Sequence, residues 1–257
     1  MSDMQPQITN SRPLLIAHRG AAAEAPENTL AAFARALALG ADGLELDVRV
    51  TRDGVPVVFH DPTLARLTGR RRAIAALALS DLRTVRIRGE PVPTLAKALA
   101  LVRGRAVVQI EIKAAAALVA VVRVVQRARA SRHVILASFE AAVVAGARAL
   151  APGIPRMLIS RGGTAENLGA KLAGLAAAGV SLDHRAIASP AFVAALQRRH
   201  YRVWCWTVNH PRLMLRLAAW GVDAILSDDP ALLKSTLRPP PPGSARRRRR
   251  PPAYPPS

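Results

Sequence analysis

Acidic side chains interrupt two apolar segments of this sequence that otherwise have the composition of buried β-strands. Glu45 and Asp47 lie two residues apart in the segment 43–48, and Glu111 and Lys113 repeat that spacing further along the chain. Residues two apart on a strand share a face, and neighbouring buried carboxylates are costly unless a cation neutralises them. One such carboxylate alone would more often be a salt-bridged surface residue. The three together predict a hard oxygen-ligand site suited to Mg²⁺ or Ca²⁺.

Two histidines also directly follow short apolar runs. His18 precedes Arg19, and His60 precedes Asp61. Residues at the carboxyl ends of parallel strands are where barrel enzymes build their active sites, so this pair is expected to act in acid/base catalysis, although a single histidine is more often structural. The remaining histidines are expected to be structural, and they are His133, His184, His200 and His210. Of these, His184 is also a candidate for the rim of the site.

The elements that would position these residues alternate along the chain. Eight β-rich segments are separated by Ala- and Leu-rich segments of helical length, which predicts parallel strands joined by right-handed crossovers. Eight such units in about 240 residues predict a (β/α)8 TIM barrel, an α/β fold. The expected strands are 14–17, 43–48, 106–112, 134–138, 155–159, 180–183, 202–208 and 224–227.

One region breaks this alternation after the second strand. Arg52-Asp53-Gly54 is a turn signal, and residues 56–59 then predict an extra short strand. Residues 65–90 are expected to form an irregular insertion above the barrel, and Thr94 is expected to cap the helix that follows.

Composition limits the cellular context. The 257 residues include one cysteine, Cys205, which cannot form an internal disulfide and suits a reducing compartment. We find no apolar run long enough to span a membrane and no secretory signal, so a cytoplasmic location is expected. The net charge of +20 comes from 33 Arg and 4 Lys against 17 acidic residues. This charge would attract anionic substrates, whereas aromatic residues, at 4%, are too few for an obvious base-stacking surface, so no specific nucleic-acid partner is expected.

The ends of the chain differ from its body. Residues 1–12 are expected to be disordered, residues 13–237 to form the barrel domain, and residues 238–257 to form a disordered tail rich in Pro and Arg. The tail's six arginines could make a weak contact with an anionic membrane surface.

The motifs around these residues closely resemble those of the glycerophosphodiester phosphodiesterase family. The resemblance spans roughly residues 14–235, and its specificity comes from the order and spacing of several motifs. They are His18-Arg19-Gly20, Pro26-Glu27-Asn28-Thr29, residues 40–48, Thr51-Arg52-Asp53-Gly54, residues 57–61, residues 64–69, residues 92–95, residues 110–113, Ser138-Phe139, residues 206–209 and residues 221–223.

This resemblance implies a function for each group. It implies hydrolysis of glycerophosphodiesters to an alcohol and glycerol 3-phosphate, with one divalent metal (Mg²⁺ or Ca²⁺, with Mn²⁺ as a further option). It implies that Glu45, Asp47 and Glu111 bind the metal. It also implies that His18 and His60 act as acid and base, and that Arg19 and Lys113 contact the phosphate. The nucleophile, either water or a substrate hydroxyl, and the division of acid and base roles stay open.

Two supporting residues, Glu27 and Asn28, and one substrate-binding residue, Trp206, have two interpretations each. Glu27 and Asn28 would shape the first loop and support the site, or would only cap a helix. Trp206 would wall a glycerol pocket, or would be a plain core aromatic.

Two alternatives to this function also stay open: phospholipase D-like hydrolysis of lysophospholipids on the same barrel, and a catalytically silent binding barrel. Departures from the family pattern in the residues 21–25, at Asn209-His210 and at Ser227 bear on substrate selectivity more than on the reaction.

Overall fold

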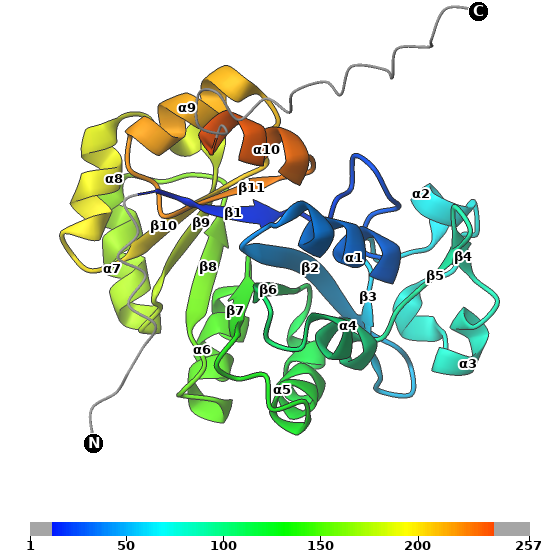
Figure 1. Ribbon diagram of the computed structural model, residues 1–257. Helices are drawn as coiled ribbons and strands as arrows, with labels where there is room; N and C mark the ends of the chain where they lie inside the picture. The colour runs from blue at the N-terminus through cyan, green and yellow to red at the C-terminus, as the bar shows by residue number, and fades with distance from the viewer. Residues whose placement is uncertain (1–11, 239–257) are drawn as a thin grey trace, which may run out of the picture.

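Eight parallel strands close into a barrel in the computed structural model, which describes residues 12–238 (Figure 1). The two terminal segments predicted to be disordered lie, apart from Arg12 and Arg238, outside the described residues. The first barrel strand pairs with both the second and the last, which closes the sheet. The barrel strands are β1 (Leu14–Ala17), β2 (Gly43–Val50), β6 (Val107–Ile112), β7 (Val134–Ser138), β8 (Arg156–Ser160), β9 (Gly179–Asp183), β10 (Arg202–Trp206) and β11 (Ala224–Ser227). The predicted (β/α)8 fold is confirmed.

Helices surround the barrel, and several of them begin at a residue whose side chain caps the helix. Thr29, Thr94, Thr164 and Ser189 each accept a hydrogen bond from the first turn of the helix that follows, which satisfies a backbone donor that has no partner within the helix. The cap predicted at Thr94 is therefore confirmed. The surrounding helices are α1 (Leu30–Leu39), α4 (Leu95–Val102), α5 (Leu118–Arg127), α6 (Ala141–Leu150), α7 (Ala165–Leu175), α8 (Pro190–Gln197), α9 (Pro211–Ala219) and α10 (Pro230–Leu237). Within residues 12–238, none of the helices has the length and apolar character needed to cross a membrane.

The insertion after β2 lies to one side of the barrel (Figure 1) and has a small core of its own. The predicted extra strand is β3 (Pro56–Val58), which runs antiparallel to β2. The prediction that residues 65–90 are irregular is wrong, because they form helices and a two-stranded hairpin. These elements are α2 (Ala65–Thr68), a 3₁₀ turn (Ile74–Ala76), α3 (Leu79–Leu82), β4 (Arg86–Ile87) and β5 (Glu90–Pro91). Each is four residues or shorter, too short for hydrophobic periodicity to reveal it.

The barrel interior changes character along its length. Ile16, Met157, Trp204 and Leu226 belong to an apolar cluster inside the ring of strands. Acidic side chains instead point inward at Glu45 and Asp47 of β2 and at Glu111 of β6. The interior is thus a packed core, as in other barrels, with a polar cluster at the carboxyl ends of its strands.

Candidate active site

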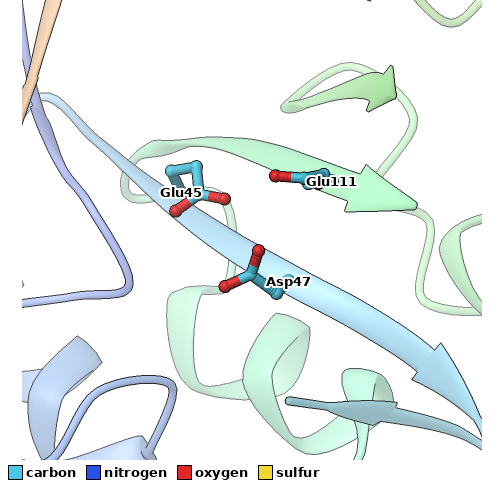
Figure 2. A group of neighbouring side chains, drawn as sticks. All are labelled: Glu45, Asp47 and Glu111. Carbon is cyan, nitrogen blue, oxygen red and sulfur yellow. The ribbon is translucent and has the colours of Figure 1, made fainter. Parts of the chain in front are cut away.

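The three predicted carboxylates converge inside the barrel. Glu45 and Asp47 lie on β2, and Glu111 lies opposite Asp47 on the neighbouring strand β6. Figure 2 shows the three side chains directed toward one another from these two strands. One ligand oxygen from each residue lies within 4.8 Å of those of the others, and all three residues are buried. Strand alternation therefore placed these oxygens correctly, and they form a group that could hold a metal ion.

Two cations neutralise part of this cluster. Lys113 Nζ lies 2.7 Å from Asp47 Oδ1 and 2.5 Å from Glu111 Oε1. Arg19 Nε lies 3.2 Å from Asp47 Oδ2, and the backbone N–H of Arg19 donates to Glu45 Oε2 at 3.0 Å. Burial opposes ionisation of Asp47, but the charges of Lys113 and Arg19 overcome it and hold the pKa of Asp47 far below its usual range. Asp47 is therefore the ionised centre of the cluster.

Glu45 lacks a comparable partner. Its nearest ion-pair partner is His18, whose Nε2 lies 3.8 Å from Glu45 Oε2. Burial and the neighbouring charge of Asp47 raise the pKa of Glu45 to about 8. Burial and the charge of Asp47 also raise the pKa of Glu111. Three acidic groups face two cationic side chains, so the donor set fits one further cation, and its all-oxygen chemistry is that of a hard divalent ion.

The two predicted histidines have the same local arrangement. His18 Nδ1 lies 2.7 Å from Asp228 Oδ1, and His60 Nδ1 lies 2.7 Å from Asp61 Oδ1. Burial alone would lower the pKa of His18, but its bond to Asp228 and the charge of Glu45 raise it above the usual value. For His60 burial prevails, and its pKa is lowered. In both rings Nδ1 is engaged, so Nε2 is the nitrogen left for proton transfer.

The loop between β1 and α1 supports this cluster. Asn28 Nδ2 donates to Asp47 Oδ2 at 2.7 Å, and the Asp47 backbone N–H donates to Asn28 Oδ1 at 3.2 Å. Glu27 accepts hydrogen bonds from Arg19 and, with both oxygens, from Arg66. The alternative in which Asn28 only caps a helix is wrong, because Thr29 is the cap of α1.

The same loop is strained at the site. Arg19 and Asn28 adopt φ angles of 55° and 58°, a left-handed conformation that is uncommon outside glycine and that Asn tolerates best. The Asn28 N–H donates to the Arg19 carbonyl at 3.0 Å, which locks the two residues together. Gly20, with φ 83°, lets the loop lie against α1, since a Cβ there would come within 2.8 Å of the Ala32 backbone.

These groups open onto a cavity of about 180 Å³. His18, Arg19, His60, Glu111 and Lys113 line one part of it, and the predicted substrate-binding residue Trp206 lines another. Trp206 is half-buried and packs against the apolar core cluster, and its indole N–H donates to the Ser181 carbonyl at 3.0 Å. The structure therefore brings all the predicted catalytic, metal and substrate-contact residues to one place.

Several residues of the site were missed by sequence reasoning. Asp228, Phe139 and Arg161 each follow a barrel strand, the same signal that identified His18. Ser181 and Gln109 are polar residues inside apolar strands, and both line the cavity. The Ser181 hydroxyl is buried and has no hydrogen-bond partner within residues 12–238. His184, a candidate for the rim, bonds through Nδ1 to the Trp206 carbonyl at 3.3 Å and does not line the cavity.

The fold is a closed (β/α)8 barrel with carboxylates, cations and imidazoles at the carboxyl ends of its strands. This combination is that of a barrel hydrolase whose acidic cluster could hold a metal ion. Residues 18–232 match the model of the glycerophosphoryl diester phosphodiesterase family, and the chain belongs to this family.

Individual relatives agree with this assignment. A glycerophosphodiester phosphodiesterase of Caldanaerobacter subterraneus is 31% identical over 88% of this chain and 98% of its own length. A probable glycerophosphodiester phosphodiesterase 2 of Mycobacterium tuberculosis is 33% identical over 87% of this chain and 90% of its own. Among solved structures, a phosphodiesterase of Oleispira antarctica in complex with the product sn-glycerol 3-phosphate superposes with a TM-score of 0.80 at 29% identity, covering 88% of this chain and 96% of that one.

Proposed function

We propose that this chain hydrolyses glycerophosphodiesters to an alcohol and glycerol 3-phosphate at the cavity formed by these residues. The observation that carries the proposal is the convergence of three carboxylates, two cations and two aspartate-bound histidines on one small cavity. Family membership supports the reaction class, and the product bound to the Oleispira antarctica relative supports glycerol 3-phosphate as the product here.

Glu45, Asp47 and Glu111 would hold one divalent cation, Mg²⁺ or Ca²⁺, with Mn²⁺ as a further option. When bound, such an ion withdraws charge from phosphoryl oxygens and lowers the pKa of a hydroxyl or water beside it. Lys113 and Arg19 lie beside the same carboxylates, so their charges would stabilise the negative charge that builds on the phosphate oxygens during attack. The Arg19 guanidinium can also make a two-pronged contact with phosphate, which an ammonium group cannot.

His18 and His60 would move the protons. Hydrolysis requires one group to take a proton from the nucleophile and another to supply one to the leaving alkoxide. Asp228 and Asp61 bond to Nδ1 of the two rings, which orients each Nε2 and supports a positive charge on it. Asp228 and Asp61 are thus positioning residues, and Glu27 and Asn28 hold Arg19 and Asp47 in place.

The wall formed by Trp206 would contact the glycerol moiety. The ring offers an apolar surface, and the unpaired hydroxyl of Ser181 lines the same cavity. An unpaired buried hydroxyl is costly unless a ligand satisfies it, and glycerol carries hydroxyls that can do so.

The lysophospholipid alternative has little support at the mouth of this cavity. Such a substrate needs an apolar rim for its acyl chain. Of the large exposed hydrophobic side chains in the described part of the molecule, only Phe139 lines the cavity, and Arg161 lies over its ring. The silent-barrel alternative is not supported either, because the chain retains all five predicted metal and acid/base residues and belongs to a family of hydrolases.

A direct test compares the wild type with His18→Ala. Metal-free protein is supplied with Mg²⁺, Ca²⁺ or Mn²⁺, and glycerol 3-phosphate release from glycerophosphoglycerol and choline release from lysophosphatidylcholine are measured. We expect turnover of the first substrate by the wild type only. His133→Ala, an exposed histidine outside this cavity, is the matched control and should retain activity. The absence of turnover with every metal would refute the proposed activity, and equal turnover by wild type and His18→Ala would refute the role of His18.

A further inference from the structure

The side of the cavity formed by β7, β8 and β10 differs from the side that carries the carboxylates. Phe139 follows β7, Arg161 follows β8, and Trp206 ends β10, and all three line the cavity. The Phe139 and Trp206 rings meet edge to face, with centroids 5.8 Å apart and an interplanar angle of 81°. The Arg161 guanidinium lies over the Phe139 ring, 5.4 Å from its centroid. We refer to these three residues as the aromatic–arginine wall.

Arg161 differs from the other cations of the cavity in having no counterion. Arg19 and Lys113 are each paired with buried carboxylates. Within residues 12–238, no carboxylate lies within ion-pair distance of Arg161, and its side chain is exposed at the cavity mouth. A guanidinium keeps its proton at any physiological pH, so this wall carries a permanent, unneutralised positive charge.

This charge has two consequences for a substrate group that reaches the wall. A cationic group is repelled by the guanidinium. It also loses the aromatic surface that quaternary ammonium groups favour, because Arg161 already lies over the Phe139 face. A neutral or anionic group meets neither obstacle, and Arg161 can donate hydrogen bonds to its oxygens.

We propose that Phe139 and Arg161 of the aromatic–arginine wall face the alcohol moiety of the substrate, while Trp206 contacts the glycerol moiety, and that Arg161 disfavours cationic alcohols relative to neutral polyol or anionic ones. The proposal rests on the function proposed above and specifies its substrate class. Arg161 is accordingly a specificity-determining residue that contacts the substrate away from the reacting phosphate.

The test compares two substrates of the same shape and different charge. Glycerophosphocholine and the glycerophosphodiester of 3,3-dimethylbutanol differ in having a quaternary nitrogen or a quaternary carbon at the same position. We expect the wild type to hydrolyse the neutral ester with the higher kcat/KM. Arg161→Gln should reduce the neutral-to-cationic ratio of kcat/KM by about tenfold, the size expected for two unit charges about 7 Å apart in a partly solvated site. Arg161→Glu should reverse the preference, and Arg161→Lys should keep most of it.

A matched control is available on the outside of the barrel. Arg216 lies on α9, its guanidinium is 5.3 Å from the ring centroid of Trp220, which directly follows that helix, and it does not line this cavity. Arg216→Gln should therefore leave the ratio unchanged. Circular dichroism shows whether Arg161→Gln is folded. If the folded variant hydrolyses both esters with the same neutral-to-cationic ratio of kcat/KM as the wild type, the inference is overturned. Hydrolysis of neither ester by the wild type would instead refute the proposed function.

Discussion

Replacing Glu45 by Gln should change stability in opposite directions with and without a divalent metal. Without metal, the pKa of Glu45 is raised from 4.5 to about 8 by burial and by the charge of Asp47. A carboxyl group whose pKa is higher in the folded than in the unfolded state destabilises the fold at any pH above its unfolded pKa. The reason is that the unfolded chain releases a proton that the folded chain must keep. The cost begins near pH 4.5, grows as pH rises, and levels off above pH 8.

The structure gives the approximate size of this effect. At pH 7.5 the difference of about three pH units between that pH and the unfolded pKa corresponds to roughly 4 kcal/mol. Glutamine is neutral at every pH and can still accept the Arg19 N–H bond through its carbonyl oxygen, but its amide is also buried and costs part of this gain. We therefore expect metal-free Glu45→Gln to be more stable than the wild type by roughly 1–3 kcal/mol, or about 3–10 °C in Tm.

With metal the order should reverse. An ion present at a thousand times its Kd stabilises the folded state by about 4.1 kcal/mol, which exceeds the metal-free advantage of the variant, and Glu45→Gln lacks one of the three ionised ligands. Thermal unfolding is followed by calorimetry at pH 7.5 in EDTA and then in excess Mg²⁺ or Ca²⁺. Titration calorimetry measures the metal affinity.

Glu166→Gln, at an exposed position in the first turn of α7, should change Tm only slightly in either condition. The reasoning is wrong if Glu45→Gln is less stable than the wild type in EDTA, and Glu45 is not a ligand if both proteins gain equally from the metal.

Two further predictions concern other groups of the barrel. Asp228→Asn keeps an acceptor for His18 Nδ1 but removes the charge 2.7 Å away, so kcat/KM should fall by about ten- to a hundredfold, the value of one charge-assisted hydrogen bond. Because the charge of Asp228 raises the pKa of His18, the limb of the pH–rate profile that reports His18 should also move to lower pH; an unchanged profile would contradict the pairing. Cys205 is fully buried, which raises its thiol pKa, so it should react with a disulfide reagent at pH 8 only after denaturation, and rapid labelling of the native protein would contradict its burial.

Elements long enough to show a repeated pattern could be predicted from the sequence. All eight barrel strands were placed within two residues at each end. The largest differences are at the ends of the second strand (Val50 rather than Val48) and the seventh (Trp206 rather than Val208). The insertion could not be predicted in the same way. Its stability comes from a separate core that includes Phe59, Ile74 and Leu82, contacts between segments that local propensity does not reveal.

The features of the site are likewise of two kinds, those that the local sequence pattern predicts and those that the tertiary structure decides. Period-2 alternation determined that Glu45 and Asp47 share a face, and the position of His18 directly after a strand determined that it lies at the carboxyl end of the barrel, because both follow from local backbone geometry. The partners of these residues were decided by the tertiary structure. Asp228 bonds to His18 across a sequence separation of 210 residues, through closure of the barrel by β1 and β11.

The charge balance of the site also depends on the tertiary structure. The sequence determined which acidic and basic residues this protein has, and its motifs determined the family. Only the folded barrel decides that Lys113 and Arg19 neutralise Asp47, that Glu45 is left without a cationic partner closer than 3.8 Å, and that Arg161 has none of its charge neutralised by a neighbouring acid in residues 12–238. The physical reason is that ionisation depends on burial and on distances of a few ångströms between charges, which chain closure sets and residue order does not.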